Sequence, residues 1–416
     1  MGRLYRGYGL RPEWRGGGAL GLRDGLIGGG QLPQGSRSPM FAAIEEGFTR
    51  PFRGLTTDGR PVEGLFPLRE TPCDTRAAVD AATSFLDCLD PGQRAAAVRP
   101  LEVAERRVWT NAFAFWEPWG VCLEQLTPAQ REAAMGTVGA CLSSRGLELT
   151  RTVMRLNEAL GELIDALQDS LREWMYWLTI FGTPSPAEPW GWQLMGHHLI
   201  YNCLIRGSQM VLTPAFLGAE PSRHDEGPYA GLSAFDEEQD RALAVVSALT
   251  AAQRERAILF PSMLSAELPP ALTSRDEGRH RGGAGRDNAV VPYEGIPAAE
   301  LSEGQRRALL ALVQTYVGRL AEDHAAEKMA EVHRHLGDTY FCWIGPHEKG
   351  EPFYYKVHSP VLWIEFDNHP GIFLDNDEPE PFHVHTIVRT PNGNDYGMDL
   401  LRQHYERFHA GTAAPR

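Results

Sequence analysis

Helix-like and strand-like stretches are segregated along this 416-residue chain rather than alternating. Helical patterns fill residues 76–170 and 236–335. Aromatic and β-branched strand patterns fill residues 172–218 and 338–390, and a last helix is predicted at 397–409. Regular alternation would favour a doubly wound parallel sheet, whereas segregation favours an α+β fold. We therefore predict an antiparallel or mixed sheet that packs against a mainly helical N-terminal and central part.

The chain changes character near residue 70. Residues 1–70 are rich in Gly, Arg and Pro and show little periodicity, so we expect an irregular arm. Residues 71–416 are expected to form a single domain, because a hydrophobic content of 43% supports one sizeable core. Two polar stretches, 220–231 and 275–288, are predicted to be surface loops.

Four helix starts share one pattern, in which Asp, Ser or Thr is followed three residues later by Gln-Arg. The short side chain can accept from the third helical N–H while the Gln reaches back to the cap. The intervals between the matches are uneven, so we interpret them as separate helix starts and not as a repeat array. The matches are 90–94, 127–131, 250–254 and 302–306.

Net charge, cysteine content and hydrophobic runs exclude several classes of protein. A formal charge of -14 argues against non-specific nucleic-acid binding. The six cysteines form no C-x-x-C pair, so we expect reduced, mostly buried thiols. The sequence has no apolar run long enough for a membrane span and no signal-peptide core near residue 1. We expect a cytoplasmic protein without nucleic-acid or membrane partners, and the oligomeric state stays open, a homo-oligomer included.

The segment 382–390, FHVHTIVRT, has the two-residue period of a β-strand. His383, His385 and Arg389 share one face of that strand with Ile387, while the other face is mostly apolar and suits a core. Two imidazoles and a guanidinium are costly to bury without partners. We therefore expect this polar face to line a functional pocket.

First-row metals bind three or four nitrogen and oxygen ligands that rigid elements hold in place. His383 and His385 supply two imidazoles. Glu365, in the strand pattern VLWIEFDN, could add a carboxylate, and the segment GHH offers His197 or His198. We predict one divalent transition-metal ion, either iron, copper, manganese or zinc. The alternative is a set of histidines that hydrogen-bond to backbone carbonyls without a metal.

The choice between His197 and His198 depends on the strand that we expect there. Neighbouring residues of a strand point to opposite faces, so only one of the two can join the site. We favour His198, because Asn202 follows it in phase and could orient a ligand.

Arg389 is a candidate substrate anchor, since its planar fork matches carboxylate or phosphate oxygens. The alternative is an ion pair with Asp395 or Asp399. Asp395 could orient a ligand histidine, although we favour capping of the last helix.

The pocket is expected to be lined by the aromatic side chains of Trp190, Trp192 and Tyr355, with His358 as a reserve ligand. The remaining histidines are expected to be solvated or to lie in turns, among them His280 and His369. The acidic insertion 369–381 is interpreted as a solvated loop, with a lid over the site as the alternative.

Five segments together resemble one family. PWGWQLMGHHL, VLTPAFLGAEP, FYYKVHSPVLWIEFDN, FHVHTIVRTPNGNDYG and DLLRQHY occur in the order typical of the domain-of-unknown-function family 3500 (DUF3500). The resemblance covers residues 100–410 and includes the G-H-H-L segment, the H-x-H strand that ends at Arg389, and the D-Y-G turn at 395–397. It implies no settled activity.

The residues therefore favour a metal-dependent enzyme that acts on a small, anionic organic substrate. A mononuclear non-haem oxidoreductase or oxygenase is the leading expectation. A zinc-type hydrolase of an ester or amide is the second, and a non-catalytic binding protein with a histidine-lined pocket is the third. A structural metal site, with no open coordination position, is a further alternative.

Overall fold

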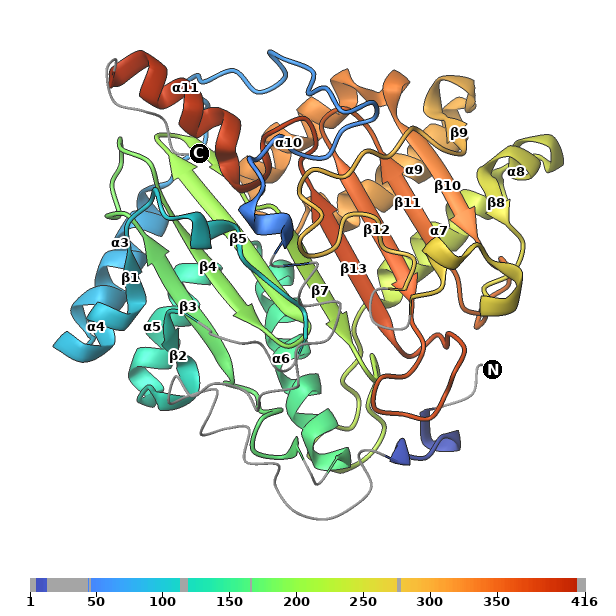
Figure 1. Ribbon diagram of the computed structural model, residues 1–416, viewed down its shortest axis with the longest axis horizontal. Coiled ribbons are helices and arrows are strands. Elements are labelled where there is room, and N and C mark those ends of the chain that lie inside the picture. Colours follow the sequence, from blue (N-terminus) through green and yellow to red (C-terminus); the bar gives the residue numbers. More distant parts are fainter. Residues whose placement is uncertain are drawn as a thin grey trace.

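The computed structural model describes residues 5–12, 44, 46–112, 119–164, 167–274 and 278–409. Within these ranges the chain has the predicted α+β fold, with one large mixed sheet, most helices packed on one side of it and helix α11 on the other (Figure 1). The helices are α3 (Arg76–Asp87), α4 (Pro91–Ala97), α5 (Pro128–Gly139), α6 (Ser144–Leu163), α7 (Asp236–Ala248), α8 (Ala251–Ala257), α9 (Glu303–Val317), α10 (Glu322–Arg334) and α11 (Met398–Phe408).

The strands of the sheet run from β1 near residue 98 to β13 near residue 389. Their bounds are β1 (Val98–Arg99), β2 (Val121–Cys122), β3 (Tyr176–Phe181), β4 (Trp190–Gly196), β5 (Leu199–Arg206), β6 (Gln209–Val211), β7 (Ala215–Ala219), β8 (Ile258–Phe260), β9 (Ile296–Pro297), β10 (Tyr340–Ile344), β11 (Tyr354–His358), β12 (Trp363–Asn368) and β13 (Val384–Arg389).

Several predicted elements are shorter than expected. The helices predicted at 236–258 and 299–335 are each broken once, at Thr250 and after Val317. Thr250 begins a new helix because its side chain accepts from the N–H of Gln253 and so caps a fresh start. The stretch 191–218, predicted as two strands, forms parts of four, because the chain also turns between Gly196 and Leu199 and breaks between Val211 and Ala215.

The strand order places the H-x-H strand at the centre of the sheet. The main path is β1-β3-β4-β5-β7-β13-β12-β11-β10-β8. One face packs against α3, α5, α6, α7, α9 and α10, and these elements share the main hydrophobic core. The opposite face, which loops and helix α11 cover (Figure 1), carries the side chains of His385 and of His383, the residue just before β13.

The strands on either side of the β7–β13 pair are arranged in the same way, so that the two halves of the sheet correspond. β5, β4 and β3 follow β7 on one side, and β12, β11 and β10 follow β13 on the other. Each outer strand, β3 or β10, also has a short parallel neighbour, β1 or β8. Each half of the sheet is preceded by two helix pairs, α3–α6 in the first half and α7–α10 in the second. The described chain therefore contains two similarly built halves.

The four Gln-Arg motifs are confirmed as capping boxes, but they are more than separate helix starts. Gln130 Nε2 donates to Gln93 Oε1 at 2.8 Å, and Gln305 Nε2 donates to Gln253 Oε1 at 2.7 Å. The motifs therefore work in pairs, one pair in each half. The uneven spacing hid this relation, because loops of different length separate equivalent elements.

The Gly-rich stretch 275–288 is not a surface loop over its described part, and that prediction was wrong. Residues 278–287 lie against the polar face of the sheet, with Arg279, His280 and Asp287 buried. A side chain at Gly282 would place its Cβ 2.9 Å from Trp363 Nε1 and 3.2 Å from Glu365 Oε2. Glycine is needed there for close approach of the backbone, not for flexibility.

The other irregular segments agree in part with expectation. Residues 51–70 contain no helix or named strand, and most of the 1–50 arm lies outside the described residues. The 220–231 stretch is largely exposed after its first residues. The insertion 369–381 is not a solvated loop throughout, because Phe373 and Leu374 are buried while Asp375 and Asp377 are exposed.

Candidate metal centre

Three imidazoles from two distant parts of the chain meet on the loop-covered face. His385 lies near the start of β13, His383 immediately precedes that strand, and His198 comes from the two-residue turn between β4 and β5. The Nε2 atoms of His383 and His385 are 3.0 Å apart, and those of His385 and His198 are 3.1 Å apart. All three side chains are buried. We call this group the histidine triad.

Protons alone cannot satisfy these three nitrogens. His383 Nδ1 lies 2.8 Å from the carbonyl oxygen of Pro370 and must carry its proton there, so its Nε2 presents a lone pair. His385 Nε2 can donate to only one of its two neighbours, which leaves one short nitrogen–nitrogen contact without a good hydrogen bond. A metal at about 2.1 Å from each nitrogen would place adjacent ligands about 3.0 Å apart in an octahedral face and about 3.4 Å apart in a tetrahedron. The triad therefore fits a transition-metal ion better than it fits a hydrogen-bond network.

A glycine makes room for the triad. Gly218 of β7 is paired with His385, and a Cβ there would lie 2.8 Å from His385 Cδ2 and 3.2 Å from His198 Cδ2. The Gly218 N–H also donates to the carbonyl of His198 at 2.8 Å, which fixes the turn. His198 itself has a positive φ of 59°, an uncommon conformation for a residue with a side chain. Backbone strain of this kind is often retained at functional sites.

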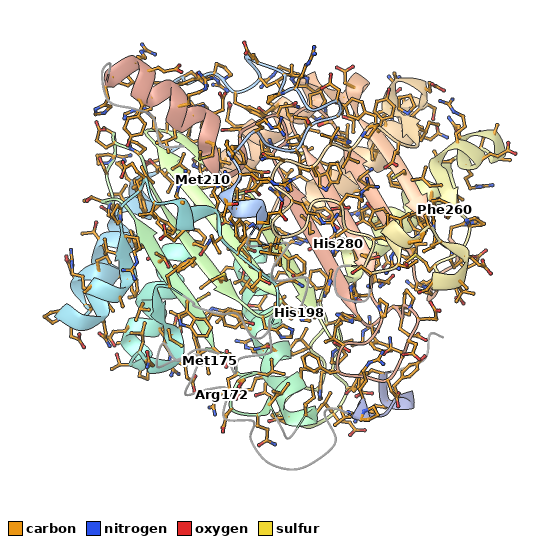
Figure 2. The ribbon with its side chains drawn as sticks, in the orientation of Figure 1. Arg172, Met175, His198, Met210, Phe260 and His280 are labelled. Carbon is orange, nitrogen blue, oxygen red and sulfur yellow. The ribbon has the colours of Figure 1, made fainter. Side chains whose placement is uncertain are left out.

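Two further histidines surround the triad, and the sequence analysis missed both. The His369 ring centroid lies 4.5 Å from that of His385, and its Nδ1 donates to the carbonyl of Pro370 at 2.9 Å. The ring of His280 is stacked near His385 at 5.6 Å (His198 and His280 are labelled in Figure 2). Neither His280 Nε2 nor His369 Nε2 has a hydrogen-bond partner among the described residues. The charged neighbours of His280 suggested a solvated side chain, and Pro370 beside His369 suggested a turn.

Burial keeps these imidazoles neutral. Desolvation lowers the pKa of His280 and of His369 to about 3. The pKa values of His198, His383 and His385 are also lowered well below the usual range, first by burial and then by neighbouring histidines. Neutral imidazole is the form that binds metals, so the triad needs no deprotonation at neutral pH.

A buried carboxyl group, also missed from the sequence, lies behind the triad. Glu220 follows β7, and its Oε1 accepts from the N–H groups of Ile372, Phe373 and Leu374 at 3.1–3.3 Å. Its Oε2 is 3.7 Å from His383 Nδ1. Burial raises the pKa of Glu220 to about 7. Glu220 thereby ties the 369–381 insertion to the end of β7.

The family model described as "Protein of unknown function (DUF3500)" matches residues 72–398, which is most of the chain. The chain belongs to the DUF3500 family. No curated protein and no solved structure matches it. The family match agrees with the resemblance seen in the sequence motifs, but its description assigns no activity. The chemistry of this DUF3500 chain must therefore be argued from its own residues.

The GHH segment of the DUF3500 chain is a turn and not a strand, so the argument from strand phase was wrong. His198 nevertheless joins the triad. His197 is stacked on His198, with ring centroids 3.8 Å apart, and its Nδ1 is 2.7 Å from Asn157 Oδ1. Asn202 hydrogen-bonds Gln193 and the Pro214 carbonyl instead of a ligand histidine.

Glu365 lies on the same sheet face as the triad but does not join it. The residue opposite Glu365 in β13 is Ile387, whereas the residue opposite His385 in β12 is Asp367. Glu365 accepts hydrogen bonds from two backbone N–H groups, a phenol and an indole at 2.7–2.9 Å; the donors belong to Arg281, Gly282, Tyr354 and Trp363. Its role is to hold the 278–287 loop against the sheet.

Replacing Glu365 by glutamine is expected to destabilise the protein by about 2–4 kcal/mol, because an amide cannot accept from all four donors and charged hydrogen bonds contribute about 1.5–3 kcal/mol each. Metal content should stay at the wild-type level. Urea denaturation and elemental analysis of the same preparation measure both quantities. Loss of metal at unchanged stability would instead make Glu365 a ligand.

Arg389 is not available to anchor a substrate. Its side chain is fully buried and pairs with Asp395 at 2.8 Å and with Asp287 at 2.6 Å, and it also donates to the carbonyl of Gly282. The alternative of an ion pair with Asp395 is thereby the observed one. Asp395 does not cap the last helix, since its other oxygen accepts from the N–H of Thr390. The expectation of an anionic substrate at this site depended on a free Arg389 side chain, and it is no longer supported.

The aromatic residues predicted to line the pocket lie elsewhere. Trp190, Trp192 and Tyr355 belong to the main hydrophobic core on the helix side of the sheet. His358 is on the loop-covered face, where it contacts Tyr293 and Trp363 with ring centroids 4.5 and 4.6 Å away. An aromatic side chain that does lie next to the triad is Phe216, 5.0 Å from His385 between ring centroids.

No helix of the described residues is both long enough and apolar enough to cross a membrane.

Proposed function

We propose that this DUF3500 chain is a metal-dependent enzyme that acts on a small organic molecule. One divalent transition-metal ion is held by the Nε2 atoms of His198, His383 and His385. The observation that carries the proposal is the pair of 3.0 and 3.1 Å contacts between buried, neutral imidazole nitrogens, which protons cannot satisfy together. Three ligands on one side of an ion leave coordination positions open for water, dioxygen or substrate.

Oxidation with dioxygen is the reaction class that we favour. Imidazole ligands suit iron and copper, and the apolar side chains of Phe216, Ile200 and Ile387 pack near the triad. Apolar surroundings limit the access of water to reactive intermediates. Among the described residues, Asp367 pairs with Arg279, and Glu220 lies on the Nδ1 side of His383, away from the Nε2 atoms that would hold the ion. Neither is placed as a general base for hydrolysis.

A hydrolase of an ester or amide is the second candidate. Three neutral ligands leave the full double positive charge on the ion, and zinc in such a site lowers the pKa of bound water to about 7. The same triad serves both reactions, so the identity of the metal distinguishes them.

The deciding experiment is the metal content of untagged protein. Wild type is expected to contain close to one equivalent per chain, and the double variant His383→Ala/His385→Ala is expected to contain none. His197→Gln is the matched control, because His197 adjoins the triad without belonging to it. Iron, copper or manganese supports the oxidoreductase, and zinc supports the hydrolase. Absence of metal from wild type, even after reconstitution with each ion, would contradict the proposal.

Binding of a small anion separates a catalytic centre from a structural one. Azide is expected to change the absorption or magnetic resonance spectrum of the iron-, copper- or cobalt-loaded protein, because an open coordination position accepts it. A structural site with a closed shell would leave the spectrum unchanged.

A further inference from the structure

A cavity of about 180 Å³ lies on the helix side of the sheet, away from the histidine triad. Its walls come from the β6–β7 segment, the end of β13, helix α10 and the strap formed by residues 65–73. Leu217 and Val388 line it and pack with the main core, so the sheet separates the cavity from the loop-covered face. Met210 of β6, labelled in Figure 2, marks one wall.

The strap is fastened to the domain by hydrogen bonds around the cavity. The Arg69 N–H donates to Gln209 Oε1 at 2.8 Å, and Gln209 Nε2 donates to the carbonyl of Pro67. The Thr71 N–H donates to Ser208 Oγ at 2.7 Å. These contacts hold the strap over the space and keep its wall in place.

Most of the wall is apolar. The apolar side chains come from the strap, the sheet and the helices, and include Phe66, Leu212, Leu217, Val317, Leu362 and Val388. An apolar cavity of about 150 Å³ is large enough to hold benzene. The space here therefore fits an aromatic ring or a short alkyl chain that carries one small polar group.

One end of the wall carries an incompletely paired cation. Arg319 is 3% exposed, and its Nη2 donates to Glu238 Oε1 at 2.9 Å. Its guanidinium lies over the ring of Tyr316, with the carbon 4.5 Å from the centroid. Neither Nε nor Nη1 has a hydrogen-bond partner among the described residues. Leaving buried donors of a charged group unpaired is costly, and a bound anion would supply the missing acceptors.

The charged residues around the cavity favour an anion as well. Arg69, Lys328 and Arg334 line it together with Arg319. Three carboxylates pair with these cations: Glu327 with Arg69, Glu331 with Lys328 and Glu238 with Arg319. A small local excess of positive charge remains, although the whole chain has a formal charge of -14. A carboxylate matches the guanidinium fork in shape and charge.

We infer that this cavity binds a small carboxylic acid with a compact apolar body, whose carboxylate faces Arg319. The inference does not depend on the proposed metal centre. It assigns the chain a second ligand site, on the face of the sheet opposite the triad.

Calorimetric titration with phenylacetate tests the inference, with neutral phenylacetamide as the matched ligand. Phenylacetate is expected to bind one per chain and at least ten times more tightly than the amide. Binding should be the same in metal-loaded and chelator-treated protein, which separates this test from that of the proposed function.

Arg319→Gln is expected to lower the affinity for phenylacetate at least tenfold, to that of the amide. Arg145→Gln is the matched control, because Arg145 also pairs with Glu238 but does not line the cavity. It should leave the affinity within twofold of wild type.

Met210→Trp fills the cavity without changing its charge and is expected to weaken the binding of both phenylacetate and phenylacetamide. This variant tests the inference independently if Arg319→Gln does not fold. The inference is overturned if phenylacetate fails to bind at millimolar concentration. It is also overturned if Arg145→Gln weakens binding as much as Arg319→Gln, or if Met210→Trp has no effect.

Discussion

Replacing His385 by alanine is expected to weaken metal binding by more than about 100-fold, because losing even an outer-sphere partner of a ligand costs 10–100-fold. His385 is the central member of the triad, since its Nε2 lies within 3.1 Å of both other Nε2 atoms. An ion that binds only the folded state at 1,000 times its dissociation constant stabilises that state by about 4 kcal/mol. The wild-type melting temperature should therefore fall by about 5 °C on treatment with a chelator.

The measurement is the difference in melting temperature between metal-loaded and chelated protein, taken for each variant separately. Because each variant is compared with itself, the packing lost at position 385 cancels. The difference should vanish in His385→Ala and persist in His197→Gln. If the melting temperature of the wild type does not change when the chelator has removed all metal, the triad does not hold an ion.

Replacing Arg389 by alanine is expected to destabilise the fold by about 3–5 kcal/mol, since it leaves two buried carboxylates without their cation. Asp287 belongs to the loop over the triad, and Asp395 belongs to the turn before α11. Arg389 therefore joins the end of β13 and the turn that follows it to a loop about a hundred residues earlier in the sequence. Arg389→Lys should rescue little of the loss, because an ammonium cannot reach both carboxylates and the carbonyl of Gly282 as a planar fork does.

Chemical denaturation measures this effect, and Arg402→Ala is its control. Arg402 lies in the adjacent helix α11 and pairs with Asp399 and Glu406, but it is exposed. Its loss should cost less than about 1 kcal/mol. If Arg389→Ala left stability unchanged and weakened only substrate binding, Arg389 would be a substrate anchor after all.

The local part of the site could be predicted from the sequence. A two-residue period places His383 and His385 on one face of a strand, whichever strands lie beside it. The central position of β13 buries that face, so a polar pattern within an apolar strand was informative. The α+β class was predictable for a similar reason, since segregated helix and strand patterns limit the possible connections.

The partners of that face could not be predicted, because tertiary packing decides them. Glu365 and His385 have the same kind of sequence context, since each is a polar residue within a segment predicted to be a β-strand. Only the register of β12 against β13 separates the two, by placing Ile387 and not His385 opposite Glu365. The glycines of 278–287 likewise suggest a flexible loop, yet Gly282 serves close packing against Trp363.

The turn at His197–His198 shows a further limit of pattern analysis. Two-residue hairpin turns favour Gly, Asn or Asp, and the segment contains none of them at its two central positions. The positive φ of His198 has no signature in the sequence. It becomes understandable only when Gly218 and His385 are seen to occupy the space beside it.

The two-halved sheet has a consequence for how many ions one chain can hold. Its frame resembles a twofold-symmetric dimer whose subunits have been joined, and such a dimer would carry two equivalent centres. The ligands break that symmetry. The turn between β11 and β12, residues 359–362, has the sequence SPVL, and β7 contains no histidine. Each half contributes only part of the proposed centre, His198 from the first and the H-x-H pair from the second, so neither half alone contains all three proposed ligands.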